Sequence, residues 1–182
     1  MALSRRLALV AAIAIPAVAS AQRSYFADSA LTALTINAGR FEYDLDATGR
    51  AFMVAARLER PLSRYVIGEG GLLFARPSDV NGNAFSLFVP ELQVQFQLPV
   101  RGIAPYLGFG GGLVWEPGRD RPLTPQSGGR ATDPSFSVSG GARSWITPAV
   151  GFRVEVRQRW IGGTFPGSST EWTIGLAVRD PN

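Results

Sequence analysis

The sequence predicts an all-β fold, an eight-stranded antiparallel up-and-down transmembrane β-barrel. Apolar and polar residues alternate with a period of two in eight segments, as they do in strands with two different faces. The connections between these segments alternate between tight turns and longer loops, which is the pattern of an up-and-down barrel. After the first 21 residues no apolar stretch is long enough to cross a bilayer as a helix, so a membrane-spanning chain must be a barrel.

The N-terminal segment has the parts of a Sec-type signal peptide. Arg5 and Arg6 precede an apolar run, and Ala19-Ser20-Ala21 places small residues at the positions that a signal peptidase reads. We therefore expect export and cleavage after Ala21. The expected domain organisation is a signal peptide over 1–21, a lead-in over 22–32 and one barrel domain of about 33–179 within 22–182.

Composition excludes several classes of function. The formal net charge of +4 comes from arginines that are interspersed with acids and form no run, so we expect no nucleic-acid partner. The chain has no cysteine, which excludes a disulfide scaffold. It also has no histidine, and its acids do not follow a calcium-loop spacing, so we expect no metal and no cofactor.

The first strand is expected from Leu34 onward. The alternation holds as far as Ala38 and then slips, because Phe41 and Tyr43 are both apolar. This slip predicts a bulge near Gly39-Arg40. The run that follows, DLDATGR over 44–50, is typical of a loop.

The next three strands are separated by one tight turn and one loop. Strand four has the clearest alternation of the three, with glutamines and Glu91 opposite apolar residues. Pro90 has no amide hydrogen for the ladder, so it should lie near a strand end or a bulge. The expected ranges are strand two at 51–59, a turn at 60–64, strand three at 65–75, a loop at 76–83, strand four at about 88–98 and a turn at 99–104.

The last four strands include the clearest signal in the chain. In AVGFRVEVRQRW, residues 149–160, valines and Phe152 alternate with arginines and Glu155. Strand five places glycines opposite its large apolar residues, where a narrow lumen has little room. The expected ranges are strand five at 105–115, a loop at 116–134, strand six at about 136–143, a turn at 146–148, strand seven at 149–160, a loop at 161–170 and strand eight at 172–179.

Alternation alone does not say which face of the strands meets water. A soluble exported barrel would turn its apolar face inward and bind an apolar ligand there. The export signal, the two kinds of connection and the aromatic residues near strand ends favour the reverse, with the apolar face on lipid. The aromatics expected in interfacial girdles are Phe41, Tyr43, Tyr65, Phe74, Phe88, Trp115, Trp160 and Trp172.

In this orientation nine charged residues point into the lumen. The lumen of an eight-stranded barrel is just wide enough for side chains to fill, so buried charges must pair. A salt-bridged structural plug is the expected role, and a narrow channel on the same barrel is the alternative. The candidate lumen residues are Arg57, Glu59, Glu69, Glu91, Arg143, Arg153, Glu155, Arg157 and Arg159.

The longest predicted loop supplies candidates for surface contacts. Arg119, Arg121 and Arg130 lie in it together with acids, proline and glycine. On the outer side of a membrane these arginines would meet lipopolysaccharide phosphates or a protein partner, whereas a solvated loop without a partner is the plainer alternative.

Two segments carry a resemblance to a known family. PYLGFGGGL (Pro105–Leu113) and GFRVEVRQRW (Gly151–Trp160), with the signal peptide and eight alternating strands, resemble the small OmpA-like outer-membrane barrels. The resemblance implies a monomer in the outer membrane of a Gram-negative cell, in contact with outer-membrane lipid and assembled by the barrel-assembly machinery. Enzymes built on such barrels depend on a histidine, and this chain has none. A structural or surface-interacting role without catalysis is therefore expected.

Overall fold

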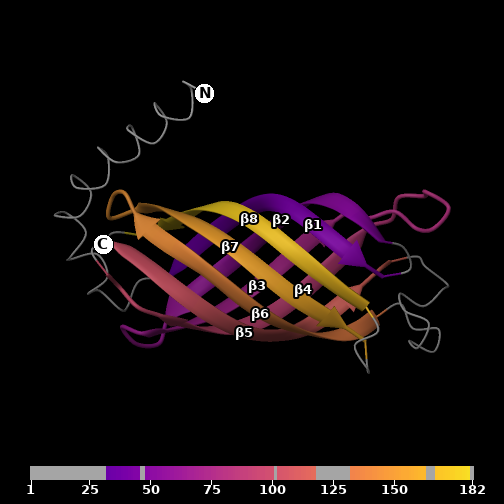
Figure 1. The fold of residues 1–182 in the computed structure, drawn as a ribbon. Coiled ribbons are helices and arrows are strands. Elements are labelled where there is room, and N and C mark those ends of the chain that lie inside the picture. The colour runs from indigo at the N-terminus through magenta and orange to yellow at the C-terminus, as the bar shows by residue number, and fades with distance from the viewer. Residues whose placement is uncertain (1–31, 46–47, 101, 118–131, 163–166, 181–182) are drawn as a thin grey trace, which may run out of the picture.

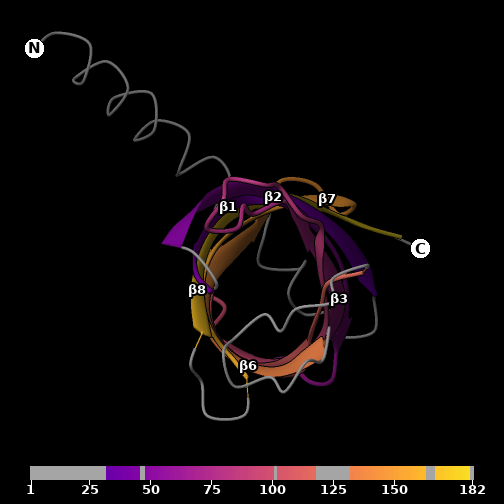
Figure 2. The same cartoon turned by 90° about the vertical axis from the view of Figure 1, so that its right-hand side faces the viewer.

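The chain folds into one closed barrel (Figure 1). The computed structural model describes residues 32–45, 48–100, 102–117, 132–162 and 167–180. Each strand pairs antiparallel with the next, and β8 pairs with β1 to close the ring (Figure 2). The strands are β1 (Ala33–Asp44), β2 (Thr48–Pro61), β3 (Val66–Ala75), β4 (Leu87–Gln97), β5 (Ile103–Trp115), β6 (Thr132–Trp145), β7 (Val150–Ile161) and β8 (Gly167–Arg179). The predicted fold class is confirmed, whereas the predicted signal peptide and nearly all of the lead-in lie outside the described residues.

The two ends of the barrel differ in their connections. At one end, here called the turn end, β2 joins β3, β4 joins β5 and β6 joins β7, and β1 starts and β8 finishes there (Figure 1). The other four connections join strands at the opposite end, here called the loop end. Three of them are shorter than predicted. β1 and β2 remain paired to Asp44 and Thr48, β5 and β6 remain paired to Trp115 and Thr132, and β7 and β8 remain paired to Ile161 and Gly167.

β1 is regular where a bulge was predicted, and that prediction is wrong. The register of β1 with β2 and with β8 runs without a break from Ala33 to Asp44. Phe41 and Tyr43 therefore continue the inward face, with exposed fractions of 0% and 6%, and they do not belong to an interfacial girdle. The slip in alternation marks a change in the character of the lumen, which is polar in the middle and apolar near the loop end.

The apolar part of the lumen is a cluster at the loop end, here called the apolar cap. Ring packing between Phe41 and Tyr43 contributes to it, with their centroids 5.8 Å apart. The Tyr43 hydroxyl accepts a hydrogen bond from the Ser78 amide at 2.8 Å and donates one to the Ser78 carbonyl at 3.2 Å, so it fixes the β3–β4 loop over the cap. The buried members are Phe41, Tyr43, Met53, Ala55, Leu73, Ala75, Leu87, Val89, Val114 and Ile161.

The same β3–β4 loop is shaped by Asp79. Its carboxylate accepts hydrogen bonds from the Asn83 amide at 2.9 Å and the Asn81 amide at 2.8 Å. These bonds, with the one from the backbone of Asn83 foremost, hold the pKa of Asp79 below its usual value. Gly82 takes a positive φ of 80° in this turn, a conformation that glycine adopts at little cost.

Pro90 lies near the start of β4, as predicted from its missing amide hydrogen. The pairing of β4 with β5 is interrupted between Phe88–Trp115 and Glu91–Gly112, on either side of Pro90. The register is the same before and after the interruption, so Glu91 keeps its inward direction.

The outside of the barrel is an apolar belt. Large apolar side chains such as Leu92, Phe52 and Ile174 are 74%, 68% and 61% exposed. The strands have 10 to 14 residues, enough to cross a hydrocarbon layer when tilted. Among the described residues no helix is long and apolar enough to cross a membrane.

Candidate functional site

The middle of the lumen holds a connected set of charged side chains, here called the lumen charge network. The period-two pleat directs these side chains inward from six of the strands, β2, β3, β4, β6, β7 and β8. All members are at most 7% exposed. The network consists of Arg57, Glu59, Glu69, Glu91, Arg143, Arg153, Glu155, Arg157, Arg159 and Glu171.

Arg153 is the centre of the half of the network nearer the turn end. Its Nη1 lies 2.7 Å from Glu59 Oε1 and also contacts Glu69, and its Nη2 lies 2.5 Å from Glu155 Oε2. These carboxylates come from β2, β3 and β7, so one guanidinium joins strands on opposite walls of the barrel. A planar guanidinium with five N–H donors suits this multiple pairing, which a lysine could not reproduce.

Arg157 and Arg159 extend the network toward the loop end. Arg157 Nη2 lies 2.9 Å from Glu155 Oε1, and its Nη1 contacts Glu91. Arg159 Nη2 lies 2.8 Å from Glu91 Oε2, and its Nε lies 2.8 Å from Glu171 Oε1. Each carboxylate of the network therefore has at least one arginine within ion-pair distance.

Tyr106 connects the charges to the β5 wall. Its hydroxyl donates a hydrogen bond to Glu155 Oε2 at 2.7 Å and accepts one from Arg153 Nε at 2.7 Å. The guanidinium carbons of Arg143 and Arg153 lie 4.8 and 5.1 Å from the centre of its ring, within cation–π distance. Arg143 in turn pairs with Glu59, with Nη1 2.5 Å from Oε2.

Glycines on the inward face of β5 make room for side chains that cross the lumen. A Cβ at Gly108 would lie 2.3 Å from Gln93 Nε2 and 2.6 Å from Ser139 Oγ. Those two atoms form a hydrogen bond of 2.5 Å between β4 and β6, directly over the β5 backbone. The glycine run in PYLGFGGGL is therefore a packing feature of the lumen.

The structure places all nine candidate lumen residues inside the barrel and brings them into one network. Sequence reasoning missed Glu171, because strand eight was expected to begin only at Trp172, whereas β8 begins at Gly167. The alternation of faces along β8 would have identified Glu171, since it lies two residues before the inward Thr173. Gln95 was also passed over, although its amide donates a hydrogen bond to Glu69 at 2.8 Å. The candidate loop residues Arg119, Arg121 and Arg130 lie outside the described residues.

This geometry decides the direction of the two faces. A barrel that binds an apolar ligand needs an apolar lumen open to that ligand, whereas here the middle of the lumen holds five arginines and five glutamates in contact. Their charges cancel, as burial requires. Among the described residues there is no group of three side chains that could hold a metal ion.

Comparison with solved structures shows the same architecture. The chain is similar to Neisserial surface protein A (14% identity, 81% of this chain and 96% of that chain, TM-score 0.65). It is also similar to the outer membrane enzyme PagL (12%, 79% and 98%, TM-score 0.58) and to Ail, the attachment invasion locus protein of Yersinia pestis (10%, 84% and 99%, TM-score 0.55). No protein-family model and no curated protein sequence matches the chain. The expected resemblance to the small outer-membrane barrels is confirmed for the fold.

Proposed function

We propose that this protein is a non-catalytic outer-membrane β-barrel that meets its partners at the loop end. The observation that carries the proposal is the inverted packing, with the lumen charge network buried and a belt of exposed apolar side chains outside. In water each exposed large apolar side chain would forgo about 1.5–3 kcal/mol of burial, whereas a bilayer accommodates the whole belt. The signal-like segment with Arg5 and Arg6 supports export.

The filled lumen supports a structural role and argues against conduction. Arg57, Arg153, Arg157 and Arg159 are 0–2% exposed, and the apolar cap lies between them and the loop end. A passing ion would have to separate ion pairs that are already desolvated, and breaking one buried pair costs about 3–5 kcal/mol. We therefore expect a closed barrel.

The use of the carboxylates supports a role without catalysis. All five glutamates of the network are engaged by arginines, so none is held as a free base beside a nucleophile. The sequence has no histidine to act as a general acid or base. One of the similar structures is an outer membrane enzyme, PagL, at 12% identity.

The names of two similar structures support a surface role. One is a surface protein and the other an attachment invasion locus protein. In this chain Arg119, Arg121 and Arg130, which lie in the sequence between β5 and β6, remain the candidate contacts for lipopolysaccharide phosphates or a protein. We expect a monomer assembled by the barrel-assembly machinery, surrounded by outer-membrane lipid.

Fractionation and conductance test this proposal together. The full chain is expressed in a Gram-negative host, and the outer membrane is separated from periplasm and inner membrane. We expect the protein in the outer-membrane fraction, extractable only with detergent, and no current from the purified protein in a planar bilayer. Recovery in the soluble periplasm would refute the membrane location, and steady single-channel currents would refute the closed lumen.

A further inference from the structure

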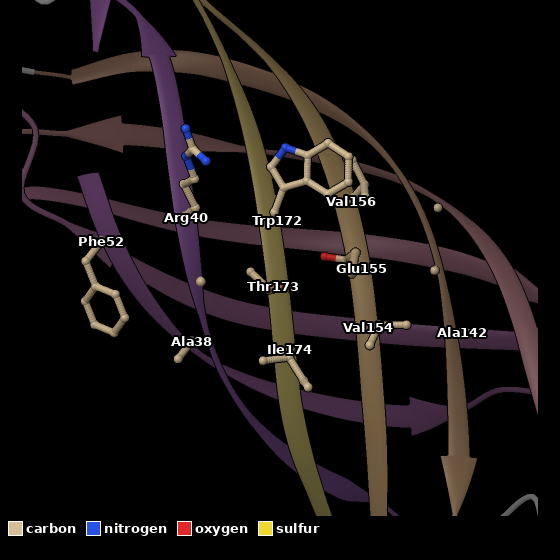
Figure 3. Close-up of a pocket in the computed structure, with 13 residues that line it drawn as sticks. Ala38, Arg40, Phe52, Ala142, Val154, Glu155, Val156, Trp172, Thr173 and Ile174 are labelled. Atoms are coloured by element: carbon tan, nitrogen blue, oxygen red, sulfur yellow. The ribbon is translucent and has the colours of Figure 1, made fainter. Parts of the chain in front are cut away.

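The outer wall is not uniformly covered by large side chains. An open groove of about 800 Å³ crosses β1, β8, β7 and β6 on the belt (Figure 3). Small residues at Ala38, Gly140 and Ala142 leave the backbone uncovered there, while Phe52 and Trp172 rise beside it. A Cβ at Gly140 would have Leu107 Cδ2, at 3.7 Å, as its nearest neighbour, so the hollow at this position has room for an added group.

The groove is apolar along most of its length and has a charged edge on one side. Arg40 follows Ala38 on the outward face of β1, one step nearer the loop end, and its register partner on β8 is Trp172. The Arg40 side chain is 46% exposed, and Trp172 is 52% exposed. In Figure 3 both stand on the outer face at the same end of the groove. An aromatic ring beside a cation is typical of the headgroup level of a membrane.

The guanidinium of Arg40, the cation at this edge, has N–H donors beyond the one in its ion pair with Glu42. Arg40 Nε lies 3.0 Å from Glu42 Oε1, and Arg50 Nε lies 3.5 Å from the same oxygen. Two guanidiniums thus share one carboxylate, which leaves one positive charge and the Nη groups of Arg40 for another anion. Guanidinium groups bind phosphate oxygens through paired N–H donors.

We propose that this groove binds an anionic, phosphate-bearing lipid of the leaflet at the loop end. The phosphate lies on Arg40 and one acyl chain runs from there toward the turn end over Ala38, between Phe52 and Trp172. The apolar floor suits hydrocarbon, and the single charged edge matches a lipid with one anionic end. The inference rests on the proposed membrane location and adds a preferred lipid class to it.

Quenching of tryptophan fluorescence by brominated acyl chains measures this contact. Trp115, Trp145 and Trp160 are replaced by phenylalanine, so that Trp172 reports alone, and folding of this background is checked by circular dichroism and by mobility in gels of unheated samples. The protein is refolded into vesicles of phosphatidylcholine that contain increasing fractions of brominated phosphatidylglycerol or brominated phosphatidylcholine. We expect the relative binding constant at Trp172 to be about fivefold higher for the anionic lipid.

Matched variants separate the two parts of the site. In the same background, Arg40→Gln should remove the preference for phosphatidylglycerol, whereas Arg60→Gln, an exposed arginine at the turn end, should keep it. Ala38→Leu, which fills the groove, should lower the quenching by both lipids, and Ala56→Leu on the same wall but outside the groove should leave it unchanged.

Each other result has a definite meaning. Equal quenching by the two lipids, or an Arg40→Gln variant with an unchanged preference, would overturn the lipid site while leaving the membrane location intact. A dimer that crosslinks through the groove and dissociates on Ala38→Leu would show that a second copy of the chain occupies it, and would also overturn the lipid site. No quenching by either lipid would mean that the belt does not meet a bilayer, and the proposed function would fail.

Discussion

Replacement of Glu69 by alanine tests whether the lumen charge network holds the barrel together. The Glu69 side chain is 1% exposed and accepts a hydrogen bond from Gln95 at 2.8 Å. It also contacts Arg153, and it lies 3.3 Å from Arg157 Nη2 and 3.8 Å from Arg57 Nε. Without it five buried arginines face four glutamates, and one positive charge is left uncompensated.

The expected cost follows from that imbalance. Removing one partner from a buried ion pair destabilises a protein by about 3–5 kcal/mol. Glu42→Gln provides the control, because this carboxylate also pairs with two arginines but is 36% exposed. An exposed pair is worth about 0–1 kcal/mol. The free energy of unfolding of the Glu69→Ala variant should therefore be several kcal/mol lower than that of the Glu42→Gln variant.

The assay is urea unfolding of the protein in phospholipid vesicles, followed by tryptophan fluorescence and by the gel mobility of unheated samples. Glu91→Ala serves as a second variant, since Glu91 pairs with Arg157 and Arg159, and it should also lower the midpoint. If both lumen variants unfold at the wild-type midpoint within about 0.5 kcal/mol, the network does not stabilise the barrel and the reasoning is wrong.

Three further changes probe other features of the barrel. Gly108→Leu should destabilise by about 1–3 kcal/mol in the same urea assay, because its Cβ would meet Gln93 at 2.3 Å; wild-type stability would show that the lumen has spare room. Leu92→Arg on the belt should cost about 2–4 kcal/mol in vesicles, and insertion without a cost would contradict a lipid-facing Leu92. Tyr106→Phe should cost about 1–3 kcal/mol by removing the hydroxyl bonded to Glu155. The same replacement should cost less in a Glu155→Gln background, because the two side chains interact.

The sequence was enough to predict the strands and the direction of their faces, because the pleat alternates strictly and the barrel is buried on one side only. Prediction from the sequence was less reliable at two places, where the lumen changes character and where a run that is typical of a loop is paired as a strand. Phe41 and Tyr43 broke the expected alternation, since the lumen itself changes from polar to apolar along its axis. Glu171 was missed because a glycine- and serine-rich run remained paired as a strand.

The partners inside the lumen were beyond sequence reasoning for a different reason. Which charges meet depends on the height of each residue along the barrel axis, and that height is set by strand tilt and by the registers of all eight pairings together. Arg57 and Glu155 are separated by 98 positions in the chain, yet Nη1 and Oε1 lie 2.6 Å apart. Neither residue alone carries a sign of this contact.

The network also has an order along the chain that bears on how the barrel closes. Its members on β2 to β4 are Arg57 and three glutamates, whereas those on β6 to β8 are four arginines and two glutamates. The first half of the chain thus carries two excess negative charges toward the future lumen, and the second half carries two excess positive ones. Opposite charges attract, so this division favours closure of the two halves on each other, and a closure slipped along the axis would misalign their charges. The network therefore favours the alignment of the two halves in which its charges are matched over one that is slipped along the barrel axis.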